Sequence, residues 1–256
     1  MATIDSAAVI IPSRYGSSRL PAKALADLDG SPMIARVYRR AALAKLPEIV
    51  IVATDDERIA RAMEGVGPVR MTDARHTSGS DRIAEVARDL DHDIIVNVQG
   101  DLPLLDPTLV DTLIERLRSD PDLGMATVAV PLTDPTRLSR PDTVKVVCDR
   151  RDRALYFSRA PIPWDRDGDH PGGALHHVGI YAYRRATLLQ FAALAPTPLE
   201  ETEKLEQLRA LEEGIAIGVV RAQGRPPMEI DTPHDLAAVR AVLADQRAVG
   251  SSEDMR

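Results

Sequence analysis

The first stretch with chemical potential is the run from Ala7 to Lys23, AAVIIPSRYGSSRLPAK. It begins as a short apolar segment and continues as a loop with three cations, Arg14, Arg19 and Lys23, at spacings of five and four residues. Backbone N–H groups, hydroxyl donors and fixed cations are the groups that bind phosphates. On a loop that folds back, the three cations could converge on one polyphosphate. The alternative is an ordinary basic surface loop, and the spacing alone leaves both interpretations open.

Two aspartates follow apolar stretches and could supply carboxylate chemistry. Asp101 comes directly after Gly100 at the end of the run IIVNVQ, and Asp231 follows the run MEI. Magnesium binds a few carboxylates together with phosphate oxygens and water, so these two aspartates opposite a phosphate-binding loop suggest a Mg²⁺ site. Asp231 could instead cap the following helix, because Asp-Thr-Pro is a good helix start. Asp101 could simply form a turn.

Five further polar residues give weaker signals. His177 and Tyr181 lie on one face of a strand-like run, since side chains alternate along a strand. They could line a polar pocket, although core packing is the usual role of a tyrosine such as Tyr181. Arg159 follows the run ALYFS and is either a cleft cation or a surface arginine. Glu206 and Gln207 lie on a predicted helix whose charged face would ordinarily be solvated.

Alternating apolar and helical segments must position these residues. Apolar runs at 7–12, 49–53 and 94–98 predict buried strands, the first ending at Pro12, with a weaker strand at 69–71. Apolar residues at helical spacing predict helices over 33–45, 83–90 and 107–118. This order is typical of a parallel sheet with helices on both faces. Ligands of such folds bind beyond the carboxyl ends of the strands, so the polar loops there are expected to share one site.

The middle of the chain, about residues 125–190, has a different pattern. Strand-like runs at 125–131, 143–148, 154–157 and 178–183 follow one another without long helices. They predict an antiparallel excursion from the parallel sheet and a candidate surface for dimerisation. A helix over 198–213, a strand over 215–220 and a helix from 232 to about 246 restore the alternation. We therefore expect one α/β domain over residues 1–256 with a smaller antiparallel lobe.

Composition and charge exclude several classes of protein. A single cysteine among 256 residues rules out an internal disulfide and a cysteine-based metal cluster. A net charge of −7 argues against a nucleic-acid-binding surface. No apolar run reaches about 18 residues, and no signal-peptide pattern is present, so we expect a cytoplasmic protein that is not inserted in a membrane. The common nucleotide-binding, zinc-protease and serine-hydrolase motifs are also missing from the sequence.

Eight blocks resemble the family of 3-deoxy-D-manno-octulosonate (Kdo) cytidylyltransferases, or CMP-Kdo synthetases. They are IPSRY with RLPAK (11–23), ATD (53–55), HTSGSDR (76–82), NVQGD (97–101), ALYFSR with IPWD (154–165), HVGIY (177–181), LEQLR (205–209) and DTP (231–233). No block is decisive alone, but together they run in family order across nearly the whole chain. The resemblance implies a Rossmann-like nucleotidyltransferase fold of the GT-A-like type, with a mostly parallel sheet and helices on both faces.

The resemblance also implies an activity, the transfer of CMP from CTP to the anomeric hydroxyl of Kdo with release of pyrophosphate, for lipopolysaccharide assembly. It implies CTP and Kdo as small-molecule partners, Mg²⁺ as cofactor and a homodimer as the assembly. No covalent nucleophile is expected. Because a hydroxyl bound to Mg²⁺ loses its proton more easily, no dedicated protein base is expected either.

Family roles carry over residue by residue to the matching positions. Catalytic roles fall on Arg14, Lys23, Asp101 and Asp231, the two aspartates being the Mg²⁺ ligands; CTP binding falls on Pro12, Ser13, Arg14, Arg19, Lys23, Ser78, Gly79, Ser80 and Gln99; Kdo binding falls on Gln99, Arg159, His177, Tyr181, Glu206 and Gln207. Lys23 is expected nearest the α-phosphate, and the loop from Ser78 to Ser80 is expected to read cytosine. Arg159 is expected to face the substrate carboxylate, which a planar guanidinium suits.

Two positions depart from the family pattern. Leu102 follows Asp101 where many relatives have an acidic residue, and His176 stands where arginine is frequent. Either change could adapt the pocket to a modified Kdo, such as an amino analogue. The alternatives are CMP activation of another acidic sugar of the sialic-acid type, or a non-catalytic nucleotide-sugar-binding module. Retention of Lys23, Asp101 and Asp231 argues against the binding module.

Overall fold

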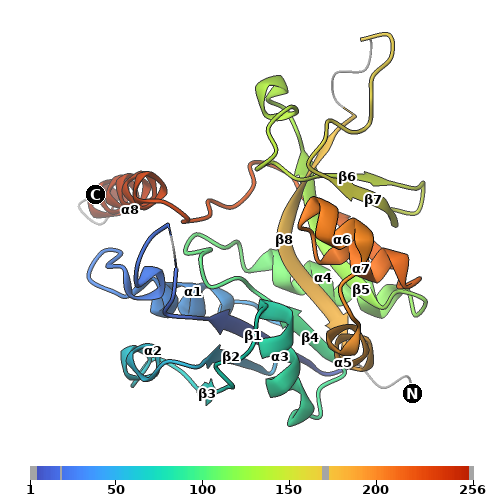
Figure 1. Cartoon of the computed structure of the whole chain (residues 1–256). Helices are drawn as coiled ribbons and strands as arrows, with labels where there is room; N and C mark the ends of the chain where they lie inside the picture. The colour runs from blue at the N-terminus through green and yellow to red at the C-terminus, as the bar shows by residue number, and fades with distance from the viewer. Residues whose placement is uncertain (1–4, 18, 169–172, 254–256) are drawn as a thin grey trace.

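A nine-stranded mixed sheet runs through the computed structural model, which describes residues 5–17, 19–168 and 173–253, the last six of these by their backbone alone. Its strands are β1 (Ala7–Ser13), β2 (Ile49–Thr54), β3 (Val69–Met71), β4 (Ile94–Asn97), β5 (Met125–Pro131), β6 (Lys145–Cys148), β7 (Ala154–Ser158), β8 (Leu175–Arg184) and β9 (Ile217–Arg221). The main path through the sheet is β3-β2-β1-β4-β8-β5-β9, and the β6–β7 hairpin joins it beside β8 (Figure 1).

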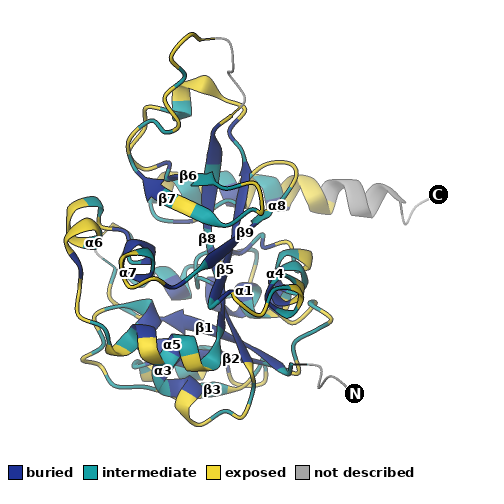
Figure 2. Cartoon of the chain, turned by 90° about the vertical axis from the view of Figure 1, so that its right-hand side faces the viewer, coloured by how far each residue is buried: buried dark blue, intermediate teal, exposed yellow. Residues whose placement is uncertain are grey.

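Helices cover both faces of this sheet. They are α1 (Met33–Ala41), α2 (Glu57–Ala62), α3 (Gly79–Arg88), α4 (Thr108–Ser119), α5 (Arg185–Ala193), α6 (Pro198–Glu203), α7 (Gln207–Glu212) and α8 (Pro233–Glu253), with short 3₁₀ turns η1 (Lys23–Leu25) and η2 (Pro135–Arg137). Figure 2 shows α3, α5 and α7 on one side of the sheet and α1, α4 and α8 on the other. The expected three-layer α/β arrangement is therefore confirmed.

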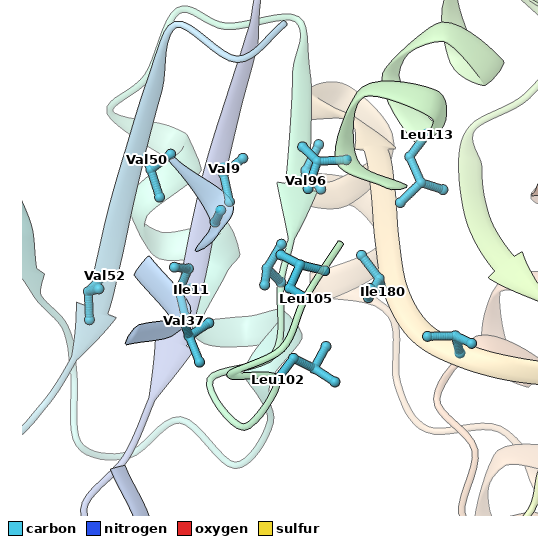
Figure 3. Packing of buried hydrophobic residues seen from close by; sticks show 14 of the residues in the cluster. Val9, Ile11, Val37, Val50, Val52, Val96, Leu102, Leu105, Leu113 and Ile180 are labelled. Carbon is cyan, nitrogen blue, oxygen red and sulfur yellow. The ribbon is translucent and has the colours of Figure 1, made fainter. Parts of the chain in front are cut away.

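The two cores explain why the strands read as continuous apolar runs. In β1, Val9 and Ile11 pack into the core beneath α1 and α4, while Ala8 and Ile10 pack into the core beneath α3. Figure 3 shows part of the first core, in which Ile11 of β1 lies beside Val37 of α1 and Val9 lies at the level of Val50 and Val96. All seven residues of β1 are buried. Because β1, β2 and β4 bury both faces, their polar residues appear only where these strands end, and those ends carry the site.

The parallel half of the sheet matches the expectation from the sequence, with one correction at its first strand. β1 pairs in parallel with β2 and β4, and β2 pairs in parallel with β3. The prediction that Pro12 ends the first strand is wrong, because β1 continues to Ser13 and stays paired with β2 there. Beyond Ile10, β1 pairs with β2 and no longer with β4. Pro12 has no N–H group, but on the side that faced β4 no strand hydrogen bond is lost.

The central position of β8 was not expected. This strand lies antiparallel between β4 and β5. Tyr181 of β8 therefore has Asn97 of β4 beside it on one edge and Thr127 of β5 on the other. The predicted strands of the 125–190 excursion are present, but β5 and β8 lie inside the main sheet, and only β6 and β7 extend from it. Residues 169–172 of that excursion lie outside the described residues. The assignment of one domain with a dimerisation lobe stays a prediction.

The predicted helix over residues 198–213 is wrong as a single element. The chain forms α6 and α7 with a break at Lys204, which adopts the left-handed conformation at φ 53° and ψ 49°. Arg159 stabilises this break, because its guanidinium donates to the carbonyls of Glu203 at 2.7 Å and Lys204 at 3.3 Å, which a continuous helix would use internally. As a result Glu206 precedes α7 and faces the interior of the molecule.

Candidate functional site

The polar loops at the carboxyl ends of β1, β4 and neighbouring segments meet at one cavity, here named the β1 cavity. It has a volume of about 420 Å³. Its cationic lining comes from Arg14, Arg19, Lys23 and Arg82, and its carboxylates from Asp101, Glu206 and Asp231. The loop between β1 and η1 supplies three of the four cations, so it is a cavity wall and not an isolated basic surface. The structure thus brings the loops that carry Lys23, Ser78 and Asp101 to one cavity, and their role as a functional site stays a prediction.

A second and larger cavity, here named the β8 cavity, adjoins the first. It has a volume of about 1020 Å³ and extends along β8 toward the β6–β7 hairpin. Six residues line both cavities: Arg19, Gly79, Gln99, Asp101, Glu206 and Asp231. The two spaces therefore meet at a boundary lined by three carboxylates, one amide and one guanidinium. Two ligands bound one in each cavity would approach each other at this boundary.

Lys23 joins the two aspartates at that boundary. Its Nζ lies 2.7 Å from Oδ2 of Asp101 and 3.1 Å from Oδ1 of Asp231. Arg19 adds a second cation, with its terminal nitrogen 2.9 Å from the same Oδ1 of Asp231. Residues far apart in the chain thus form one cluster, which we name the Lys23 cluster: Arg19, Lys23, Asp101 and Asp231.

Backbone contacts fix the two aspartates beside each other. The N–H of Ile230 donates to the carbonyl of Asp101 at 3.1 Å, which ties the segment before α8 to the loop after β4. Gly100 lets that loop approach β1 closely, because a Cβ there would lie 3.0 Å from the carbonyl oxygen of Pro12. The relative placement of the carboxylates therefore depends on main-chain packing.

The helix-capping alternative for Asp231 is not what the structure shows. Thr232 and Asp235 cap α8 together, since Thr232 Oγ1 accepts from the Asp235 N–H at 3.2 Å and Asp235 Oδ2 accepts from the Thr232 N–H at 2.8 Å. Asp235 also accepts from the Asp231 N–H at 3.1 Å. The Asp231 carboxylate is consequently directed to Lys23 and Arg19.

The electrostatics of the Lys23 cluster favour its charged form. Burial disfavours the ammonium of Lys23, but the Asp101 and Asp231 carboxylates outweigh burial and raise its pKa above the ordinary value. Two carboxylates and two cations at one point also fit a bound divalent cation together with phosphate. Magnesium takes a small number of carboxylate ligands and completes its shell with phosphate oxygens and water. The donor set at this boundary therefore fits Mg²⁺.

The remaining residues predicted for CTP line the same region. Pro12, Ser13, Ser78 and Gly79 all line the β1 cavity. Ser78 also caps α3, its Oγ accepting from the Asp81 N–H at 3.1 Å. Ser80 differs, because it is buried, lines the β8 cavity and donates to Glu206 at 2.7 Å. The structure thus brings the 78–80 loop to both cavities.

The six residues predicted for Kdo all line the β8 cavity: Gln99, Arg159, His177, Tyr181, Glu206 and Gln207. Arg159 donates three of its five N–H groups to the carbonyls of Pro141, Glu203 and Lys204, which leaves two N–H groups for a ligand. Gln207 is buried with its Nε2 unpaired within the described chain. An unpaired amide in a cavity wall is a ready donor for a hydroxyl or carboxylate oxygen.

His177 and Tyr181 lie on β8 as the period-two pattern predicted. The His177 ring packs 5.0 Å from the Phe157 ring and 5.4 Å from the Tyr181 ring, measured between centroids. Its Nε2 lies 3.0 Å from Thr127 Oγ1. Burial, with a smaller effect of His176, lowers the pKa of His177 to about 3, so its imidazole is neutral at physiological pH. Both residues line the cavity and belong to the core at once.

Several charged lining residues were not predicted from the sequence, among them two arginines and one glutamate. Arg82 is buried in the β1 cavity wall and pairs with Asp55 at 3.2 Å. Arg137 and Glu229 line the β8 cavity. Arg82 lies in one of the blocks that resemble the family, but the sequence does not show that its side chain is buried in a cavity wall. Arg137 and Glu229 lie in irregular segments whose course depends on tertiary packing, and no local pattern marks them.

Comparisons with known proteins agree with this geometry. The Cytidylyltransferase family model matches residues 8–217. A 3-deoxy-manno-octulosonate cytidylyltransferase of Halorhodospira halophila is 51% identical over 251 residues, covering 93% of this chain and 97% of that protein. A protein of the same name from Syntrophotalea carbinolica is 48% identical, covering 93% of this chain and 98% of that protein.

Solved structures give the same result for the fold. The structure of CMP:2-keto-3-deoxy-manno-octonic acid synthetase complexed with CTP has a TM-score of 0.90 and 43% identity, covering 94% of this chain and 99% of that one. A 4-diphosphocytidyl-2C-methyl-D-erythritol synthase from Anaerococcus prevotii, at 16% identity and a TM-score of 0.64, shares the fold, covering 94% of this chain and 99% of that one. The chain therefore belongs to the cytidylyltransferase family, among its 3-deoxy-manno-octulosonate cytidylyltransferases.

Proposed function

We propose that this chain transfers CMP from CTP to Kdo and releases pyrophosphate. The observation that carries the proposal is the Lys23 cluster at the boundary of the two cavities. A nucleotide in the β1 cavity and a sugar acid in the β8 cavity would place their reacting atoms there. The full-length relatives near half identity carry this activity in their names, and the CMP:2-keto-3-deoxy-manno-octonic acid synthetase structure is titled as a complex with CTP.

The chain's own residues would catalyse the transfer by positioning and charge. The sugar hydroxyl releases its proton to water and its oxygen forms a bond to the α-phosphorus of CTP. The bond from that phosphorus to the bridging oxygen breaks, and pyrophosphate leaves with the electron pair. Arg14, Arg19 and Lys23 would neutralise the phosphate oxygens, with Lys23 nearest the α-phosphate. Fixed cations in a partly buried site stabilise developing charge without reorganising, and an in-line arrangement supplies much of the remaining rate.

Asp101 and Asp231 would hold Mg²⁺ in this proposal. When bound, the ion would neutralise phosphate charge and make the sugar hydroxyl more acidic. The aspartates have a second function towards Lys23, because their charges keep its ammonium protonated and in place. Loss of either aspartate would therefore weaken both the metal site and the orientation of Lys23.

Pro12, Ser13, Ser78, Gly79 and Gln99 would contact the nucleotide in the β1 cavity, and Ser80 would act at its boundary with the β8 cavity. Kdo would bind against Gln99, Arg159, His177, Tyr181, Glu206 and Gln207 in the β8 cavity. Neutral His177 suits hydrogen bonding to sugar hydroxyls, and the unpaired Nε2 of Gln207 is available for the same purpose.

We further propose that the product serves lipopolysaccharide synthesis and that the protein acts as a homodimer in the cytoplasm, where CTP is available. None of the described helices is both long and apolar enough to cross a membrane. The exposed apolar residues of the β6–β7 hairpin and the segment after it, Leu155 and Trp164, support a dimer surface there.

Pyrophosphate release tests the activity. The purified protein is incubated with CTP, Mg²⁺ and, in separate reactions, Kdo, its amino analogue or a sialic acid. We expect release with Kdo and a CMP-sugar product by mass spectrometry. Release with sialic acid but not with Kdo would overturn the substrate assignment. No release with any of the acids, while CTP still binds by calorimetry, would indicate the non-catalytic nucleotide-sugar-binding module.

A further inference from the structure

Arg137 is a cation of the β8 cavity that the family resemblance did not assign. It ends η2, the short turn in the loop between β5 and β6, and its side chain is half-buried in the cavity wall. Within the described part of the chain its guanidinium makes no hydrogen bond and no ion pair to a protein group. A guanidinium carries five donors in a rigid fork that matches a carboxylate. A partly desolvated fork without a protein partner is a site for an anionic ligand.

The other positive groups of the same wall are already engaged or solvated. Arg140 forms an ion pair with Asp142 at 2.5 Å. Arg159 donates to three backbone carbonyls. Lys204 is exposed, and its charge is therefore largely hydrated. Burial, and then the charges of Arg137 and Lys145, lower the pKa of His176 to about 4, so that imidazole is neutral. Asp134 and Glu229 act on Arg137 only through longer-range electrostatics. Among the described residues of this wall, Arg137 is thus the half-buried guanidinium that no carboxylate or carbonyl contacts directly.

The loop that carries Arg137 is held in place from both ends. Asp134 accepts from the Thr136 N–H at 3.0 Å and from its hydroxyl at 2.7 Å, which fixes η2. At the other end, the fully buried Lys145 donates to the carbonyls of Arg140 at 3.1 Å and Thr143 at 2.7 Å. Lys145 also donates to the carbonyl of Arg159. The loop and the segment of Arg159 therefore share one buried ammonium, which preorganises both guanidinium groups.

We propose that Arg137 binds the carboxylate of the sugar acid in the β8 cavity and thereby selects acidic sugars. This inference rests on the proposed function and adds to it a residue that sets substrate class. Arg159 would approach the same ligand with its two remaining donors, and Arg137 would supply a full bidentate contact. Neither residue lines the β1 cavity, where the nucleotide is proposed to bind, so Arg137 is a specificity residue and not part of the bond-making step.

The experiment compares Arg137→Gln with Arg140→Gln. Arg140 is the matched control, because it lies in the same loop and lines the same cavity but is already paired. Pyrophosphate release is measured against Kdo concentration and, separately, against CTP concentration. We expect Arg137→Gln to raise the KM for Kdo about 10- to 100-fold, the loss of one charge-assisted contact, with the KM for CTP unchanged. Arg140→Gln should change either KM less than about threefold.

A second arm replaces the substrate carboxylate with a carboxamide. If Arg137 contacts the carboxylate, the wild-type protein should prefer the acid to the amide, and Arg137→Gln should lose most of that preference. The effects of the two changes would then not add, as a double-mutant cycle requires for a direct contact. An unchanged preference in Arg137→Gln would overturn the proposal.

The outcomes separate this inference from the proposed function. A higher KM for CTP in Arg137→Gln, with Kdo unaffected, would assign Arg137 to the phosphates and overturn the inference alone. If wild type turns over only a different acidic sugar, the same comparison is made with that sugar. If wild type turns over no acidic sugar, the proposed function and the inference both fall. Equal melting temperatures of the variants would show that the fold is intact.

Discussion

Lys23 shows how one side chain can connect two halves of a site. Its ammonium bridges Asp101 of the loop after β4 and Asp231 before α8, with the two aspartates 130 positions apart in the chain. Arg19 also pairs with Asp231, so the two cations and two carboxylates of the Lys23 cluster compensate one another. Incoming phosphates would take over part of the role of the carboxylates toward Lys23. Individual charges in this cluster should therefore matter more for turnover than for stability.

Asp101→Asn and Asp231→Asn should each lower kcat at least about 100-fold, because each removes a charge that acts on the reacting groups. Circular dichroism and the melting temperature should stay close to those of wild type. The neighbouring Asp235→Ala is the contrast, since Asp235 caps α8. It should cost about 1 kcal/mol of unfolding free energy. Near-normal kcat in Asp231→Asn would remove that residue from the chemistry.

His177 gives a pH dependence of stability with a definite sign. Burial lowers its pKa to about 3 in the folded protein, so below the ordinary value near 6.5 the unfolded chain binds a proton that the folded protein excludes. This contribution is fully present above pH 6.5 and is lost as the pH falls toward 3. His177→Gln should make the fall in unfolding free energy between pH 6 and pH 4 shallower, by about 1.4 kcal/mol per pH unit.

Urea unfolding at a series of pH values checks this expectation. His234→Gln at an exposed position is the control and should keep the wild-type pH dependence. Parallel curves for wild type and His177→Gln would contradict the assignment of His177 as a buried neutral imidazole.

At the scale of elements, the site depends on how closely the loops after β1 and β4 approach each other. Gly100 makes this approach possible, since a Cβ there would lie 3.0 Å from the backbone oxygen of Pro12. A backbone atom moves away from an added methyl group less readily than the end of a flexible side chain does. The position of Asp101, the next residue, is therefore coupled to the absence of a side chain at Gly100.

Gly100→Ala should displace the Asp101 loop and lower kcat about 10- to 100-fold, because small displacements of reacting groups have large effects on rate. Gly16→Ala is the matched control, since an added Cβ at Gly16 meets nothing within 4 Å and the residue lines the same cavity. Steady-state kinetics of the two variants makes the comparison. Equal activities of the two would show that the loop adapts to the added methyl group.

At the scale of the whole molecule, two large apolar side chains remain exposed near the β6–β7 hairpin. Leu155 is 62% exposed on β7 and Trp164 is 80% exposed in the segment that follows. Exposed apolar side chains of this size are typical of an interface. The β1 cavity lies elsewhere, since none of its lining residues comes from the hairpin.

A variant with Leu155→Ser and Trp164→Ala should therefore shift the protein from dimer to monomer in sedimentation equilibrium. Leu43→Ser is the control, because Leu43 is similarly exposed, at 59%, but lies after α1, far from the hairpin in the chain. It should leave the mass unchanged. A wild-type protein that sediments as a monomer at all concentrations would contradict the dimer.

The sequence predicts the parallel half of this fold well for a physical reason. Strands buried on both faces have continuous apolar runs, and their polar ends stand out, so the loops carrying Lys23 and Asp101 could be placed in one site. The features that could not be predicted depend on contacts between distant segments. The break at Lys204 is stabilised by the distant Arg159, and the choice between capping and charge pairing for Asp231 depends on Thr232, Asp235 and Lys23.

The antiparallel strand β8 has a consequence for the order in which the protein can fold. It supplies the second partner of β4 and, together with β9, both partners of β5. A nascent chain that has not reached residue 184 therefore leaves one edge of β4 without its partner and β5 without a place in the sheet. The β8 cavity and the segment of Asp231 form only after that closure. The last third of the chain thus closes the open edge of the sheet and, through Glu206 and Asp231, completes the lining of both cavities.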